Sequence, residues 1–197
     1  QEEAATDMQA MVGVSRDERA LSSPLFAMRK RLPWLNINLL TAFLAASVVG
    51  VFENTIAQFT ALAVLLPVVA GQSGNTGAQA LAVIMRGLAL REIQIRHWQR
   101  VLLKEVLAGA LNGIAIAIVT GLGVMIWSQS AGLAMVIGVA MVISMALAGL
   151  SGAAIPLVLT RLGQDPAQSA SIILTTVTDI VGFFSFLGLA TLFSTLL

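Results

Sequence analysis

One aspartate lies inside a long apolar segment near the end of the chain. Asp179 belongs to the stretch TTVTDIVGFF, where Thr175 and Thr178 share much of its helical face. An unpaired carboxylate in a bilayer is costly, so it usually faces a water-filled path or a bound cation. Hydroxyls, backbone carbonyls and a carboxylate are hard oxygen ligands, suited to Mg²⁺ or Ca²⁺. The segment predicts a cation site; the alternative is a structural Asp hydrogen-bonded to Ser or Thr.

A second polar stretch interrupts the apolar sequence of residues 67–86. It reads GQSGNTGAQ, a composition typical of a helix break that exposes backbone carbonyls. Gly74 and Gly77 would let another segment approach closely, and Asn75 offers a side-chain oxygen. Irregular backbone at membrane depth is tolerated only against protein or an aqueous cavity. We expect a broken helix facing Asp179, with a polar turn or a close-packed seam of small residues as the alternative.

The elements that position these residues are predicted to be membrane helices. The 197 residues are 57% hydrophobic and 11% charged, whereas soluble domains average about 45–50% and about 25%. A spanning helix needs about 20 mainly apolar residues. Five segments qualify, at residues 33–52, 59–90, 101–127, 131–159 and 167–196. Asp179 then lies about 18 Å into the fifth span, near the bilayer midplane. The predicted fold is an all-α membrane protein with five transmembrane helices.

Basic residues predict the orientation of these spans. With residue 1 inside, every Lys and Arg falls before the first span, around the second–third connection or in the fourth–fifth connection. All of them are then cytoplasmic, as the positive-inside rule expects. We therefore expect a multi-pass protein of the cell (inner) membrane, with the N-terminus cytoplasmic and the C-terminus outside. Residues 1–32 are predicted to form a cytosolic connecting helix and residues 33–197 the membrane domain, cut from a longer protein.

The remaining sequence offers little for enzyme chemistry. There is no cysteine, and no Ser–His–Asp set or phosphate loop is present. The net charge of +1 gives no reason to expect a nucleic-acid partner. Glu105 follows Lys104 directly, and we expect an ion pair between them at the inner interface. The chain is not expected to be an enzyme.

Three segments resemble the MgtE family of magnesium channels. PVVAGQSGNTGAQALAVIMRGLALREI resembles the second membrane helix of that family, and WQRVLLKE resembles the start of its third. RLGQDPAQSASIILTTVTDIVGFFSFLGLA is similar to its fourth–fifth loop and fifth helix. EEAATDMQAMVGV resembles the end of the cystathionine-β-synthase (CBS) pair that leads through a connecting helix into the membrane. The resemblance covers nearly all of the chain, with its motifs in order.

The resemblance implies a homodimer with five spans per subunit and an ion path at the subunit interface. Asp179 of each subunit would hold a largely hydrated Mg²⁺, helped by backbone carbonyls near Thr175 and Gly74. Some members carry a second Asn where this chain has Ala78, which leaves the backbone there as the ligand. Many members also have a proline before the Thr-x-x-Asp motif, where this chain reads SIIL. We therefore expect a milder kink near Asp179.

The family also carries cytosolic Mg²⁺ sites that lock the channel closed. The matching positions are Glu3 and Asp7 in the leader and Asp165 in the last inner loop. Together these features predict a magnesium channel that passes the ion inward, with Mn²⁺, Co²⁺ and Ca²⁺ left open as further ions. The alternatives are a Na⁺- or H⁺-coupled divalent-cation transporter and a membrane scaffold in which Asp179 only holds helices together.

Overall fold

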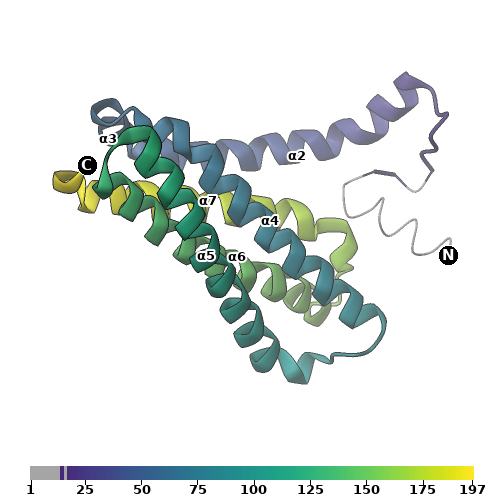
Figure 1. Ribbon diagram of the computed structural model, residues 1–197. Helices are drawn as coiled ribbons and strands as arrows, with labels where there is room; N and C mark the ends of the chain where they lie inside the picture. The colour runs from purple at the N-terminus through teal and green to yellow at the C-terminus, as the bar shows by residue number, and fades with distance from the viewer. Residues whose placement is uncertain (1–13, 16) are drawn as a thin grey trace.

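The computed structural model describes residues 14, 15 and 17–197, and every regular element in that part is helical (Figure 1). Its α-helices are α2 (Pro24–Val51), α3 (Glu53–Gln58), α4 (Ala61–Ala89), α5 (Trp98–Ser128), α6 (Ala131–Arg161) and α7 (Pro166–Leu192). Two 3₁₀ turns, η1 (Ile95–His97) and η2 (Ser194–Leu196), precede α5 and follow α7. The expectation of an all-α protein is confirmed for these residues.

Four helices are long and apolar enough to cross a bilayer. They are Pro24–Val51, Trp98–Ser128, Ala131–Arg161 and the part of α7 from Ser169 to Leu192. The chain is therefore a multi-pass membrane protein whose helices contact lipid. α4 has 29 residues, enough to span at about 1.5 Å per residue, but its polar stretch keeps it out of this group. A fifth span at α4 stays a prediction.

The first helix begins well before the predicted first span. Ser23 caps α2 by accepting a hydrogen bond from the Phe26 backbone N–H at 3.4 Å, and Pro24 follows as the first helical residue. The helix then continues through Pro33, where the span was predicted to begin. Residues 24–32 thus extend the first membrane helix without a break.

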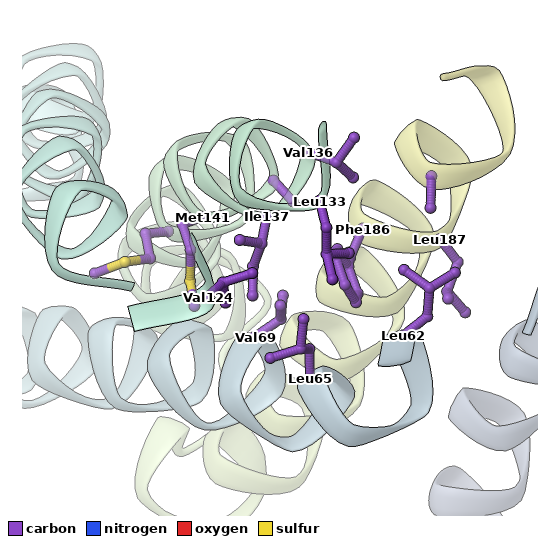
Figure 2. Close-up of a cluster of buried hydrophobic side chains, with 13 residues drawn as sticks. Leu62, Leu65, Val69, Val124, Leu133, Val136, Ile137, Met141, Phe186 and Leu187 are labelled. Atoms are coloured by element: carbon purple, nitrogen blue, oxygen red, sulfur yellow. The ribbon is translucent and has the colours of Figure 1, made fainter. Parts of the chain in front are cut away.

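Consecutive helices of the bundle α4 to α7 run antiparallel, and α2 packs against α7 while its N-terminal part extends away from the bundle (Figure 1). α6 packs against α4, α5 and α7, whereas α4 and α5 scarcely touch one another. The bundle core gathers around Ile137 and Met141 of α6, Val69 of α4, and Phe186 and Leu187 of α7 (Figure 2). All five of these side chains are fully buried. α6 is therefore the central helix on which the other elements are positioned.

Glycines bring α6 close to two of its neighbours. A Cβ added at Gly149 would lie 2.5 Å from the backbone oxygen of Glu105 on α5. One added at Gly152 would overlap the Gly77 carbonyl oxygen and lie 2.8 Å from the Ala80 Cβ, both on α4. Small residues at such crossings let membrane helices approach closely, where dispersion contacts are the main attraction.

The expected break in the glycine-rich stretch is wrong, because α4 is one continuous helix from Ala61 to Ala89. Each glycine weakens a helix by about 1 kcal/mol relative to Ala, but this penalty is local. The hydroxyl of Ser73 donates to the Val69 carbonyl at 2.9 Å, and that of Thr76 donates to the Gln72 carbonyl at 2.9 Å. The two hydroxyls are therefore hydrogen-bonded within α4, and packing against α6 and α7 favours a continuous helix.

Candidate metal site

Asp179 lies near the middle of α7, and its side chain is half-buried. The neighbouring Thr178 is fully buried, and its methyl lies 3.0 Å from where a Cβ on Gly77 would stand. Gly182, one turn further on, faces α4 so closely that an added Cβ would lie 3.1 Å from the Ser73 Oγ. Because its two neighbours contact Ser73 and Gly77, Asp179 lies at the level of the glycine-rich stretch.

The structure thus brings together the two segments that the sequence analysis paired. The Ser73 hydroxyl, besides its bond within α4, lies 3.5 Å from the Thr178 carbonyl oxygen. The contact is made by helix faces rather than by exposed carbonyls at a break. Metal binding by Asp179 stays a prediction, and any backbone ligand would come from an unbroken α4 or α7.

Thr175 and Thr178 lie one turn apart on α7, as expected, but they differ in exposure. Thr175 is exposed, whereas Thr178 is buried against α4. The Thr175 hydroxyl donates to the Ser171 carbonyl at 2.9 Å, and the Thr175 carbonyl accepts from the Thr178 hydroxyl at 3.1 Å. The carbonyl that the family resemblance assigns to the ion is therefore engaged in this conformation.

Gly74 and Ala78 lie on a side of α4 that this chain leaves open. A Cβ added at Gly74 or at Gly71 would meet nothing within 4 Å. Ala78 is exposed and follows at helical spacing, so these positions form a stripe of small residues. The stripe lies at the level of Asp179, because Ser73 and Gly77 on the same stretch contact the α7 residues that flank it.

Asn75 points into a separate polar cavity of about 300 Å³. Gln72 and Gln79 of α4 and Asn112 of α5 line this cavity with it, and Asp179 does not. The sequence analysis missed Asn112, although an asparagine inside an otherwise apolar helix was the available signal. Asn75 therefore belongs to the α4–α5 side of the helix in this subunit, and its role as an ion ligand stays a prediction.

The predicted cytosolic ligands are only partly described. Glu3 and Asp7 lie outside the described residues. Asp165 is exposed and directly precedes α7. Within the described ranges no three His, Asp or Glu side chains lie close enough together to hold a metal ion. The ion pair expected at the inner interface is confirmed, since Lys104 Nζ lies 2.6 Å from Glu105 Oε1.

Comparison with known proteins decides the family. Residues 66–189, which hold α5, α6 and most of α4 and α7, match the MgtE family model, described as a divalent cation transporter. The chain belongs to the MgtE family. The matched range includes the glycine-rich stretch and Asp179, so the resemblance of these motifs to the family is confirmed.

Three curated MgtE relatives are each named as a magnesium transporter. The protein of Enterococcus faecalis is 35% identical over 98% of this chain, and that of Bacillus subtilis is 32% identical over 97%. The protein of Thermus thermophilus is 36% identical over 87% of this chain. The chain spans 42%, 42% and 38% of the length of these relatives, respectively. The MgtE relatives are thus transporters rather than enzymes, and they match along most of this chain.

Proposed function

We propose that two copies of this chain form a channel that conducts hydrated Mg²⁺ inward across the cell (inner) membrane. The observation that carries the proposal is the position of Asp179. Among the described helices it is the only ionisable residue near the middle of a membrane-length helix, and α4 packs beside it through Ser73 and Gly77. A carboxylate at this depth is suited to a cation in a water-filled path. The relatives named as magnesium transporters support Mg²⁺ as the ion.

Hydration of the ion follows from the scarcity of ligands. Asp179 has no acidic or histidine cluster around it among the described side chains. Mg²⁺ demands six oxygen ligands and gives up its waters reluctantly. One carboxylate from each subunit can therefore hold the ion through its water shell, with selectivity arising from size and hydration.

A homodimer is supported by the surfaces that one copy leaves uncovered. α2 buries only Ala45, while Leu40 and Phe43 are 67% and 64% exposed. The stripe formed by Gly71, Gly74 and Ala78 is also open. A two-fold axis beside α4 and α7 would cover these faces and place two copies of Asp179 opposite each other. In this arrangement α4 serves as the fifth span and lines the ion path.

The proposed orientation rests on the basic residues. The start of α2, the α4–α5 connection and the α6–α7 connection lie at one end of the bundle (Figure 1). The described Lys and Arg residues belong to these segments, to the leader before α2 or to the adjoining helix ends. Placing this end in the cytoplasm agrees with the positive-inside rule. The inside-negative potential then contributes about 4.6 kcal/mol per 100 mV to the entry of a divalent ion.

The test is Mg²⁺ uptake into proteoliposomes that contain the full chain. Asp179→Asn should lower uptake by about tenfold or more, since a loss of about 1.4 kcal/mol of ion stabilisation is a factor of ten. Glu53→Gln, an exposed carboxylate at the opposite end of the bundle, is the matched control and should conduct normally. Undiminished uptake by Asp179→Asn would overturn the channel proposal and favour a purely structural Asp179.

A further inference from the structure

A cavity of about 420 Å³ lies where the C-terminal end of α4 meets η1 and the first turns of α5. One part of its wall is apolar and includes Val83, Ile84 and Val101. Another part is charged and includes Glu92, Arg100, Lys104 and Glu105. Such a division of the wall is suited to a molecule with a charged head and an apolar body.

Both carboxylates at this cavity are neutralised within the protein. Glu105 is buried and pairs with Lys104 at 2.6 Å. Glu92 pairs with Arg86 of α4 at 3.6 Å. Because both carboxylates have a cationic partner, the cavity has no free acidic group for a metal ion. Arg100 has no ion-pair or hydrogen-bond partner among the described residues and is the cation left over. The cavity therefore favours a single negative charge.

The adjoining helix terminus favours the same sign of charge. His97 stands at the N-cap of α5, but its side chain makes no capping hydrogen bond. Its Nδ1 instead accepts a hydrogen bond from the Gln94 backbone N–H at 3.2 Å. The first backbone N–H groups of α5 are therefore not capped by a side chain, and they carry the positive end of the helix dipole. Arg100 lies in the first turn of α5, so its positive charge and the helix N-terminus both attract an anion to the same end of the helix.

The cavity lies at the height of lipid headgroups. It sits at the end of the bundle that carries the basic residues, and Trp98, which follows the lining residue His97 but lines a different cavity, is 48% exposed at the same end of α5. Tryptophan at such positions is typical of the membrane–water interface. Val83 of the cavity wall is 54% exposed, and Leu107 and Leu111, further along α5 toward its middle, are 53% and 68% exposed. An acyl chain can lie against this surface while its headgroup enters the cavity.

From this position and charge we propose that the cavity binds the phosphodiester headgroup of an anionic phospholipid, with Arg100 donating to the phosphate. The leaflet concerned is the cytoplasmic one, so the inference rests on the proposed orientation. Pockets with basic side chains between membrane helices on the cytoplasmic side are known to recognise such headgroups. The lipid would tie the α4–α5 connection to the ends of both helices.

The experiment measures phosphatidylglycerol bound to the detergent-purified full chain by native mass spectrometry. Arg100→Gln should weaken binding by about tenfold, the factor expected for one charge-assisted hydrogen bond. Arg96→Gln is the matched control, because Arg96 is exposed on the same connection but does not line the cavity. Arg100→Lys should restore part of the binding, which a folding defect in Arg100→Gln would not explain.

Three outcomes would overturn the proposal. They are equal binding by Arg100→Gln and the control, equal binding of phosphatidylcholine and phosphatidylglycerol, and displacement of the lipid by millimolar inorganic phosphate. The last outcome would assign the cavity to a soluble phosphate instead. Asp179→Asn should bind the lipid normally, so loss of lipid binding with intact Mg²⁺ uptake, or the reverse, separates this inference from the proposed channel.

Discussion

The Ser73 Oγ of α4 lies 3.5 Å from the carbonyl oxygen of Thr178, the residue that precedes Asp179 on α7. The same Oγ would stand 3.1 Å from a Cβ added at Gly182. One small side chain on the glycine-rich stretch therefore touches α7 on both sides of Asp179. This contact fixes the level of Asp179 along α4, next to Ser73.

A double-mutant cycle tests this contact. Gly182→Ala brings a methyl against the Ser73 hydroxyl, while its other neighbours lie at ordinary distances of 3.6 and 3.9 Å. Ser73→Ala removes the hydroxyl and frees space for that methyl. We expect Gly182→Ala to be more favourable in the Ser73→Ala background than in the wild type, by about 0.5 kcal/mol or more. Thermal unfolding of the four proteins in one detergent measures the coupling, and strictly additive effects would contradict the contact.

The close crossing of α4 and α6 at Gly77 and Gly152 gives a second prediction. Gly152→Ala would push a methyl into the backbone of Gly77, which cannot move aside as a side chain can. We expect a loss of about 1–3 kcal/mol in unfolding free energy, as for other overpacked sites. Gly123→Ala is the matched control in α5, because a Cβ there meets nothing within 4 Å. It should be neutral or stabilising by up to about 1 kcal/mol through helix propensity. Equal effects of the two changes would argue against the close crossing.

Sequence patterns predicted the helical elements well because a membrane-length helix is recognised from the hydropathy of consecutive residues. The predicted span at residues 131–159 coincides closely with α6, and the end of the first span at residue 52 with the end of α2. The ion pair of Lys104 with Glu105 also followed from adjacent residues. Each of these features depends on residues that are near in sequence.

The features that sequence analysis missed depend on packing between helices. The polar, glycine-rich stretch suggested a broken α4, but contacts with α6 and α7 keep the helix regular. Asn112 lies far along the chain from Asn75, so their shared cavity could not be read from either segment. Thr175 and Thr178 differ in exposure because α4 covers Thr178, which the sequence of α7 alone does not indicate. Periodicity places a residue on a face, but only the neighbouring helix decides what that face meets.

The driving force for uptake distinguishes a channel from the coupled transporter. Two features favoured a coupled transporter, namely a broken helix and a midplane carboxylate. The continuous α4 removes the first of them. We expect Mg²⁺ entry into proteoliposomes to follow an imposed inside-negative potential, with no change when a Na⁺ or pH gradient is added or removed. Fluorescent Mg²⁺ indicators inside the vesicles provide the measurement. Uptake that stops when both gradients are abolished at constant potential would favour the transporter instead.

The open stripe on α4 gives the sharpest test of where the ion passes. Gly74 has free space in one subunit, so Gly74→Leu should leave the fold of that subunit intact. In a dimer with its path beside α4 and α7, the leucine would narrow the path and replace accessible backbone with an apolar group. We expect Mg²⁺ uptake to fall by about tenfold or more, comparable to about 1.4 kcal/mol of added barrier.

Gly123→Leu provides the matched control, since Gly123 is exposed on α5 with the same free space and lies outside the proposed path. Both variants should elute from size-exclusion chromatography like the wild type. Loss of uptake in Gly74→Leu alone would support a path along this stripe, because the two changes add the same volume at sites where a Cβ meets nothing within 4 Å. Normal uptake by Gly74→Leu would place the ion path elsewhere, and the amide-lined cavity around Asn75 and Asn112 would then be the next region to block.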